Sequence, residues 1–95
     1  VVYWPDKIAR GQVSRAMTHS SDWFPTFAEL AGADAQKVSG KSLAGLLTGS
    51  VATVRGDNEA VDMEIWAKRG IIADGFKLVS SGKPNERVVW ELDNL

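Results

Sequence analysis

The chain has 95 residues, of which 44% are hydrophobic and 24% charged, with a formal net charge of -1. This is the composition of an ordinary globular domain and argues against disorder along the whole chain. The lack of cysteine excludes disulfides, thiolate metal sites and cysteine nucleophiles, and the balanced charge argues against a nucleic-acid or anionic-membrane surface.

The N-terminal segment predicts a strand followed by a turn. Val1 to Trp4 is a β-branched and aromatic run that Pro5 ends, as is typical of a strand end. It has no basic region and no apolar core of a signal peptide, and no run in the chain approaches the roughly 18 apolar residues of a membrane span. Residues 5–12 predict a turn with Asp6 and Gly11 as its turn residues, and residues 13–19 are expected to be irregular.

Residues 22–32 predict the best-defined helix of the chain. Ser20, Ser21 or Asp22 is expected to cap its start, because each can accept a hydrogen bond from a free N–H group. Pro25 falls in the first turn, where its missing donor costs little, and Gly32 suits the left-handed residue that ends a helix. The apolar positions of this helix predict one buried stripe, formed by Phe24, Phe27, Leu30 and Ala31.

The middle of the chain predicts a polar loop, a short helix and a second polar stretch. Residues 33–41 are the loop, and Ser42 is expected to cap a helix over 43–47 that Gly49 ends. Residues 50–58 are polar and are expected to be exposed.

From Ala60 onward the apolar residues alternate with a period of two, which predicts strands. A first strand over 61–66 is followed by a turn near 68–70, and Asp74-Gly75 is a strong signal for a two-residue hairpin turn. Residues 76–80 predict the return strand, with Phe76 and Leu78 on one face, and 81–85 a further turn. A last strand over 87–92 places Val88, Trp90 and Leu92 on one face. The predicted class is α+β: a small antiparallel sheet of three to four strands with one or two packed helices.

Candidate chemical residues are few, and none forms a complete active site. His19 is the only histidine, and we interpret it as a loop residue at the start of the helix, although Asp22 could orient it. Asp62 and Glu64 share a strand face, where paired carboxylates can perform acid–base chemistry, but a solvated face explains them better. The four tryptophans could stack on a sugar or a base, yet burial in the core or in a domain interface is the expectation for them: Trp4, Trp23, Trp66 and Trp90.

Gly40-Lys41-Ser42 has only a superficial likeness to a phosphate-binding loop. The glycine required five residues before Gly40 is replaced by Ala35, so we dismiss this motif. No Gly-x-Ser-x-Gly nucleophile motif occurs either.

Five segments, in order, resemble the C-terminal region of type I sulfatases, the arylsulfatase family of the alkaline-phosphatase-like superfamily. Residues 22–32 match the signature Asp-x-x-Pro-Thr-x-x-x-Leu-Ala-Gly. The others are the run at 1–5 with Gly11; Gly40 to Leu43 with Leu46 to Gly49; Glu64 and Arg69 with 75–79; and Trp90-Glu91-Leu92. The chain departs from the family pattern at Asp6, Ile72 and Asp93-Asn94, which weakens the subfamily assignment more than the family assignment.

The resemblance implies a sulfuric ester hydrolase as the parent protein. Residues 1–58 would then be the end of its large α/β domain, and 59–95 its C-terminal antiparallel subdomain. The family's formylglycine motif, Cys/Ser-x-Pro-x-Arg, and its calcium or magnesium ligands lie upstream and do not occur here. No catalytic, cofactor-binding or metal residue is therefore assigned, and Asp22 is interpreted as a hydrogen-bond acceptor at the helix start.

Three functional hypotheses remain open at this point. The chain is a structural, inactive C-terminal segment of a sulfatase, whose partner is an N-terminal catalytic domain. Alternatively, it is the same region of a phosphonate or phosphate monoester hydrolase of the superfamily. The third hypothesis is a non-catalytic module that binds a glycan or a protein through exposed tryptophans. For the isolated chain, the apolar faces of Val1 to Trp4 and of the helix predict self-association. The compartment stays undetermined.

Overall fold

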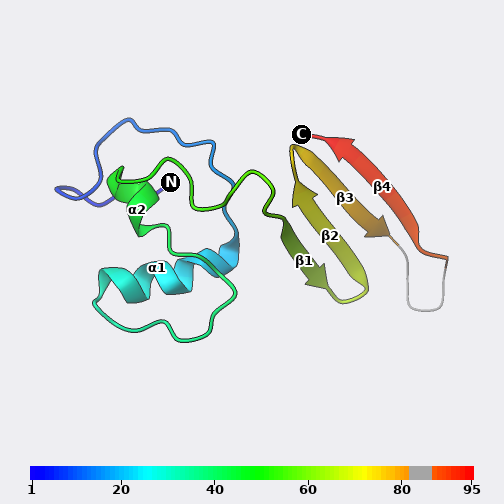
Figure 1. Cartoon of the computed structure of the whole chain (residues 1–95), viewed down its shortest axis with the longest axis horizontal. Coiled ribbons are helices and arrows are strands. Elements are labelled where there is room, and N and C mark those ends of the chain that lie inside the picture. The colour runs from blue at the N-terminus through cyan, green and yellow to red at the C-terminus, as the bar shows by residue number, and fades with distance from the viewer. Residues whose placement is uncertain (82–86) are drawn as a thin grey trace. The chain divides into compact units, whose positions relative to one another are not determined.

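A computed structural model describes residues 1–81 and 87–95, and these divide into two compact units, 1–55 and 56–95. The class is α+β: a four-stranded antiparallel sheet with two short α-helices, as predicted from the sequence (Figure 1). None of the described helices is long and apolar enough to cross a membrane.

The first unit contains a 3-10 turn, η1 (Ser20–Asp22), that leads into helix α1 (Trp23–Leu30), and a short helix α2 (Ala44–Thr48). Pro25 lies in the first turn of α1 and Gly32 follows it with a φ of 71°, so both predicted end signals are confirmed. The N–H of Ala33 donates to the carbonyl of Ala28 (2.8 Å), which closes the helix end in the way a left-handed glycine allows.

Asp22, one of the three predicted caps, is the N-cap residue of α1, but its side chain makes no capping hydrogen bond to this helix. His19 is the N-cap of η1: its ring nitrogen Nδ1 accepts from the Ser21 N–H (3.3 Å), and the Asp22 carboxylate accepts from the His19 N–H (2.7 Å). Asp22 therefore accepts a hydrogen bond at the helix start, as expected, but it reaches back from the third position of a capping box.

The predicted buried stripe of α1 is wrong. Phe24 and Phe27 are 63% and 62% exposed, and the face that packs consists of Pro25 and Thr26, together with Asp22 just before the helix. These three residues are spaced i, i+3 and i+4, so they also share one helix face. The polar face packs because its groups find hydrogen-bond partners in the loop over 40–43.

Helix α2 begins at Ala44, one residue later than predicted. The Ser42 hydroxyl still accepts from the Ala44 N–H (3.2 Å), and Gly49 ends the helix with a φ of 80°. The predicted strand at Val1 to Trp4 does not form, since no described strand lies beside it to provide a ladder. The predicted turn after it is present: Ile8 N–H donates to the Trp4 carbonyl (3.0 Å), and Asp6 and Gly11 both have positive φ.

The second unit is a simple antiparallel meander in the order β1-β2-β3-β4 (Figure 1). Its strands are β1 (Val61–Ile65), β2 (Lys68–Ala73), β3 (Phe76–Ser81) and β4 (Val89–Asn94). The hairpin at Asp74-Gly75 is confirmed, with φ values of 49° and 77°. The last strand is shifted by two residues toward the C-terminus, since it covers Val89–Asn94 and not the predicted 87–92. The turn predicted over 81–85 lies, beyond Ser81, outside the described residues.

The turn predicted at 68–70 is wrong, because the chain reverses at Trp66-Ala67. Gly70 lies inside β2, where a Cβ atom would approach the Met63 Cγ to 3.1 Å. The lack of a side chain at Gly70 therefore leaves room for the Met63 side chain, and close packing is a known role of glycine within strands.

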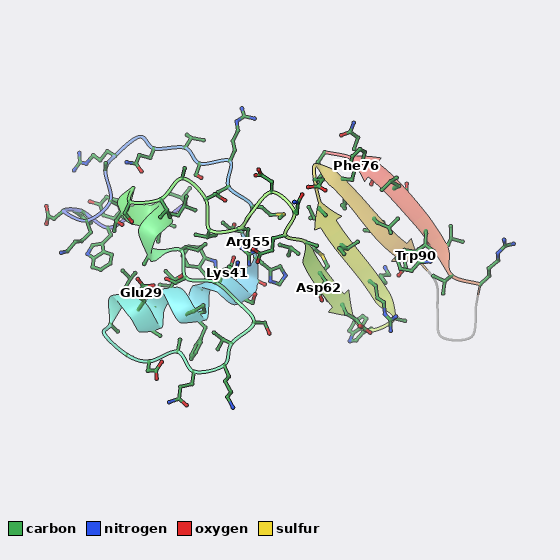
Figure 2. The ribbon with its side chains drawn as sticks, viewed as in Figure 1. Glu29, Lys41, Arg55, Asp62, Phe76 and Trp90 are labelled. Carbon is green, nitrogen blue, oxygen red and sulfur yellow. The ribbon has the colours of Figure 1, made fainter. Side chains whose placement is uncertain are left out.

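The register places a group of apolar side chains side by side on one face of the sheet. Ile71 pairs with Leu78 and Leu78 with Leu92, so these three form a row across the sheet. Phe76 and Trp90, both labelled in Figure 2, share this face by the two-residue period. The predicted shared faces are thus confirmed for Phe76 with Leu78 and for Trp90 with Leu92, whereas Val88 lies before the start of β4. Leu92 and Trp90 are 64% and 54% exposed.

Candidate functional site

The centre of the first unit is an ion pair between Asp22 and Arg55. Their side chains are 0% and 6% exposed, and the guanidinium binds the carboxylate with two parallel hydrogen bonds, Nη1 to Oδ2 (2.7 Å) and Nη2 to Oδ1 (2.6 Å). This fork-to-fork geometry is the strongest form of an arginine–carboxylate contact. Arg55 Nη1 also donates to the Met17 carbonyl (3.2 Å), so one side chain joins three parts of the chain.

Both carboxylate oxygens of Asp22 accept a further bond from the backbone. The His19 N–H donates to Oδ2 (2.7 Å) and the Lys41 N–H donates to Oδ1 (2.9 Å). Figure 2 shows Lys41 and Arg55 beside the start of α1. The carboxylate thus organises the segment before the helix, the loop over 40–43 and the chain at Arg55 around a single charge.

Thr26 extends this centre by one turn of α1. Its hydroxyl donates to the Asp22 carbonyl (2.6 Å) and accepts from the Leu43 N–H (2.8 Å). Gly40 completes the contact, because a Cβ at this position would overlap the Ser21 carbonyl group. Among the residues that the structure describes, no buried side-chain nitrogen or oxygen lacks a hydrogen-bond partner.

The charge state of Asp22 follows from these contacts. Burial alone raises the pKa of a carboxyl group, but the hydrogen bonds from Arg55, Lys41 and His19 and the positive charge of Arg55 outweigh it. Together they lower the pKa of Asp22 from 3.8 to about 2. The group is therefore a fully ionised, fully paired carboxylate at neutral pH, which suits a structural role and not proton transfer.

The other candidate residues lie apart from this centre. His19 lies at the start of the helix, as expected, with its Nδ1 2.8 Å from the Ser21 hydroxyl. Asp62 and Glu64 are exposed on the sheet, and Glu64 pairs with Arg69 across the strands (Oε2 to Nε, 3.4 Å). In the described part of the chain, no group of three or more His, Cys, Asp or Glu side chains is placed to hold a metal ion.

The expectation that the tryptophans are buried in a core is wrong for three of them. Trp66 is 95% exposed, Trp90 54% and Trp4 38%, whereas Trp23 is half-buried and stacks on Phe27 with ring centroids 5.7 Å apart. Trp66 occupies the turn between β1 and β2 and so does not share a strand face with Asp62 and Glu64. Burial in a domain interface stays a prediction.

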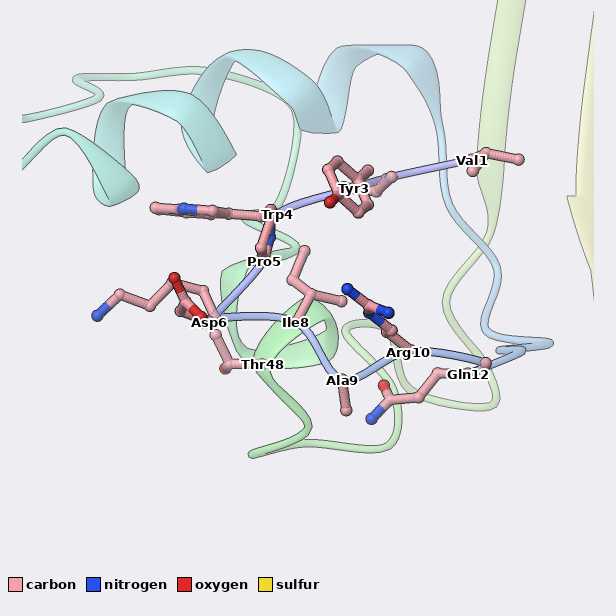
Figure 3. Close-up of a pocket in the computed structure, with 13 residues that line it drawn as sticks. Val1, Tyr3, Trp4, Pro5, Asp6, Ile8, Ala9, Arg10, Gln12 and Thr48 are labelled. Atoms are coloured by element: carbon pink, nitrogen blue, oxygen red, sulfur yellow. The ribbon is translucent and has the colours of Figure 1, made fainter.

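A hollow of about 950 Å³ lies beside the N-terminal loop (Figure 3). Its lining consists of residues 1–12 and Thr48, among which Tyr3, Trp4 and Arg10 are labelled in the close-up. The lining contains one carboxylate, Asp6, and no histidine.

Arg55 and Thr26 are the residues that sequence reasoning missed. Arg55 lies in a polar stretch with no local sign of burial, and only the tertiary structure shows its partner. Thr26 had a usable signal, since Asp22, Pro25 and Thr26 share a helix face and are three of the six fixed positions of the signature that residues 22–32 resemble. Comparisons with protein-family models and with curated proteins found no match to the chain.

Proposed function

We propose that this chain is the C-terminal segment of a sulfatase of the alkaline-phosphatase-like superfamily, and that it is structural and inactive by itself. The parent would hydrolyse a sulfate ester with residues that lie upstream of this segment. Among the described residues, no group of three or more His, Cys, Asp or Glu side chains could hold a metal ion. The one close hydroxyl–imidazole contact, between Ser21 and His19, lies in the turn that caps the helix start. The contribution of this chain to the reaction would therefore be to support the catalytic domain.

The observation that carries this proposal is that two of the segments that resemble the family hold each other in place. Asp22 and Thr26 belong to the first segment, and they bind the N–H groups of Lys41 and Leu43 in the second. Positions that a motif fixes for such contacts determine a scaffold, whereas catalytic positions keep polar atoms free for a substrate. Their complete pairing supports a family landmark with a structural role.

Two measurements test the proposal. The first reads the coding sequence that adjoins this segment, where we expect a Cys/Ser-x-Pro-x-Arg motif; a different catalytic motif would assign the parent to another branch of the superfamily. The second assays the isolated chain on an aryl sulfate, with the Arg55→Met variant as the matched control. We expect no turnover from either protein, and turnover that this variant abolishes would contradict an inactive role.

A further inference from the structure

The β1–β2 hairpin presents a tryptophan in an unusual way. Trp66 is the first residue of a two-residue turn, has a φ of 57° and is 95% exposed. Positive φ is rare for a bulky residue, and a turn with positive φ at this position favours glycine. In the neighbouring hairpin of the same sheet, the first turn position is Asp74, with a φ of 49°, and Gly75 follows it, which is a preferred pair for such a turn. Nothing in the turn itself therefore requires a tryptophan at position 66.

The residues next to Trp66 in the hairpin are mostly charged, with balanced charge, and include one exposed apolar side chain, Ile65. Ile65 and Lys68 pair at the base of the turn, and Glu64 and Arg69 form the next pair, about 3.4 Å further along the strands. The Glu64–Arg69 ion pair uses Arg69 Nε, and both side chains stay more than half exposed. The Arg69 backbone is fixed as well, because its N–H donates to the Ser80 hydroxyl (3.0 Å).

This chemistry discriminates among partners for the hairpin tip. An anionic membrane requires an excess of cations, but the two exposed acids Asp62 and Glu64 balance the charges of Lys68 and Arg69. A protein hot spot requires a surrounding apolar ring that excludes water, and here Ile65 is a single exposed apolar neighbour beside the charged side chains of Glu64, Lys68 and Arg69. A pyranose ring fits, because its C–H face packs on an indole and its hydroxyl rim binds carboxylate and guanidinium groups.

We propose that Trp66 is a stacking platform for a sugar ring, and that Glu64 and Arg69 bind the hydroxyl groups of that sugar. The inference does not depend on a sulfatase parent, since it uses only the contacts of one hairpin. A sulfated sugar would gain a further contact with Lys68.

The test is a titration of the full chain with maltotetraose and with a chondroitin sulfate tetrasaccharide, each up to about 10 mM, which would nearly saturate a site with a Kd of about 1 mM. NMR spectra resolve the four indole N–H signals, and we expect the Trp66 signal to shift saturably. Trp66→Tyr should keep the shift at the Lys68 amide, because an aromatic face remains. Trp66→Gly should weaken the affinity at least tenfold while the hairpin stays folded, because glycine suits the turn.

Trp90→Tyr is the matched control, since Trp90 is another exposed tryptophan on the same sheet, and it should leave the Trp66 shift unchanged. The proposal is overturned if neither sugar shifts the Trp66 signal, if all four indole signals shift together, or if Trp66→Gly binds as well as the original chain. A response to phosphatidylserine vesicles without a response to either sugar overturns it too, and assigns the tip to a lipid surface.

Discussion

The two units of this chain are stabilised in opposite ways. The first unit, 1–55, has little regular structure and is organised by a buried ion pair whose atoms also bind the backbone at residues 17, 19 and 41. The second unit, 56–95, is a regular ladder in which nearly all large side chains stay partly exposed. Side chains thus determine the fold of the first unit and backbone pairing that of the second, so substitutions should act differently in each.

The largest effect is expected from Arg55→Met. The substitution leaves the buried carboxylate of Asp22 without its partner, and breaking a buried ion pair in this way costs about 3–5 kcal/mol. Amide hydrogen exchange of α1 should show the loss, and Arg10→Met, which removes an exposed arginine, should not change it. Arg55→Lys should fall between the two, because lysine keeps the charge but not the paired hydrogen bonds. Full protection of α1 in Arg55→Met would refute the central role of this pair.

Gly40→Ala is expected to cause the next largest loss of stability. The added methyl group would overlap the Ser21 carbonyl, so the loop over 40–43 must move and loses its bonds to Asp22 and Thr26. Overpacking against a fixed backbone costs about 1–3 kcal/mol and sometimes more. Gly56→Ala is the matched control, since no atom lies within 4 Å of the new methyl group. Equal denaturation midpoints for the two variants would contradict the tight contact.

The ion pair also predicts an acid-sensitive first unit. The pKa of Asp22 is lower in the folded state, about 2, than its ordinary value of 3.8. Its contribution, about 2 kcal/mol, is therefore present above the ordinary value and is lost as the pH falls toward 2. The free energy of unfolding of the first unit, measured by denaturation at a series of pH values from about 6 to about 2, should show this loss. In Asp22→Asn this acid-dependent loss should disappear, and an unchanged acid profile in that variant would assign the effect to other groups.

The smallest effect, and the opposite sign, is expected at Trp66. Replacing it by glycine removes the left-handed strain of a bulky residue, and the second unit should gain about 1 kcal/mol after the greater flexibility of unfolded glycine is counted. Amide exchange in β1 and β2 should slow accordingly. Gly75→Trp, which places the same residue at a position with a φ of 77°, should speed it. A destabilised Trp66→Gly hairpin would show that the indole stabilises the turn and is not retained for binding.

Local residue chemistry predicted the helix and hairpin ends well. Pro25, Gly32 and Gly49 mark helix ends, and Asp74-Gly75 marks a turn, because each acts through its own backbone or that of its neighbours. The alternation after Ala60 likewise predicted the strands and the shared faces of β3 and β4. Gly70 misled the prediction because glycine also serves close packing, and the contact with Met63 is visible only once the strands are paired.

The contacts of the candidate site could be predicted from the sequence only in small part. The sequence by itself determined that the start of α1 carries a hydrogen-bond acceptor and that the chain holds few groups for catalysis. Only the tertiary structure decided that Arg55, 33 residues away, neutralises that acceptor, and that Pro25 and Thr26, not Phe24 and Phe27, form the packed face of the helix. The reason is physical: capping and turn preferences act within a few residues, whereas the burial of a charge depends on which distant donors the fold brings to it.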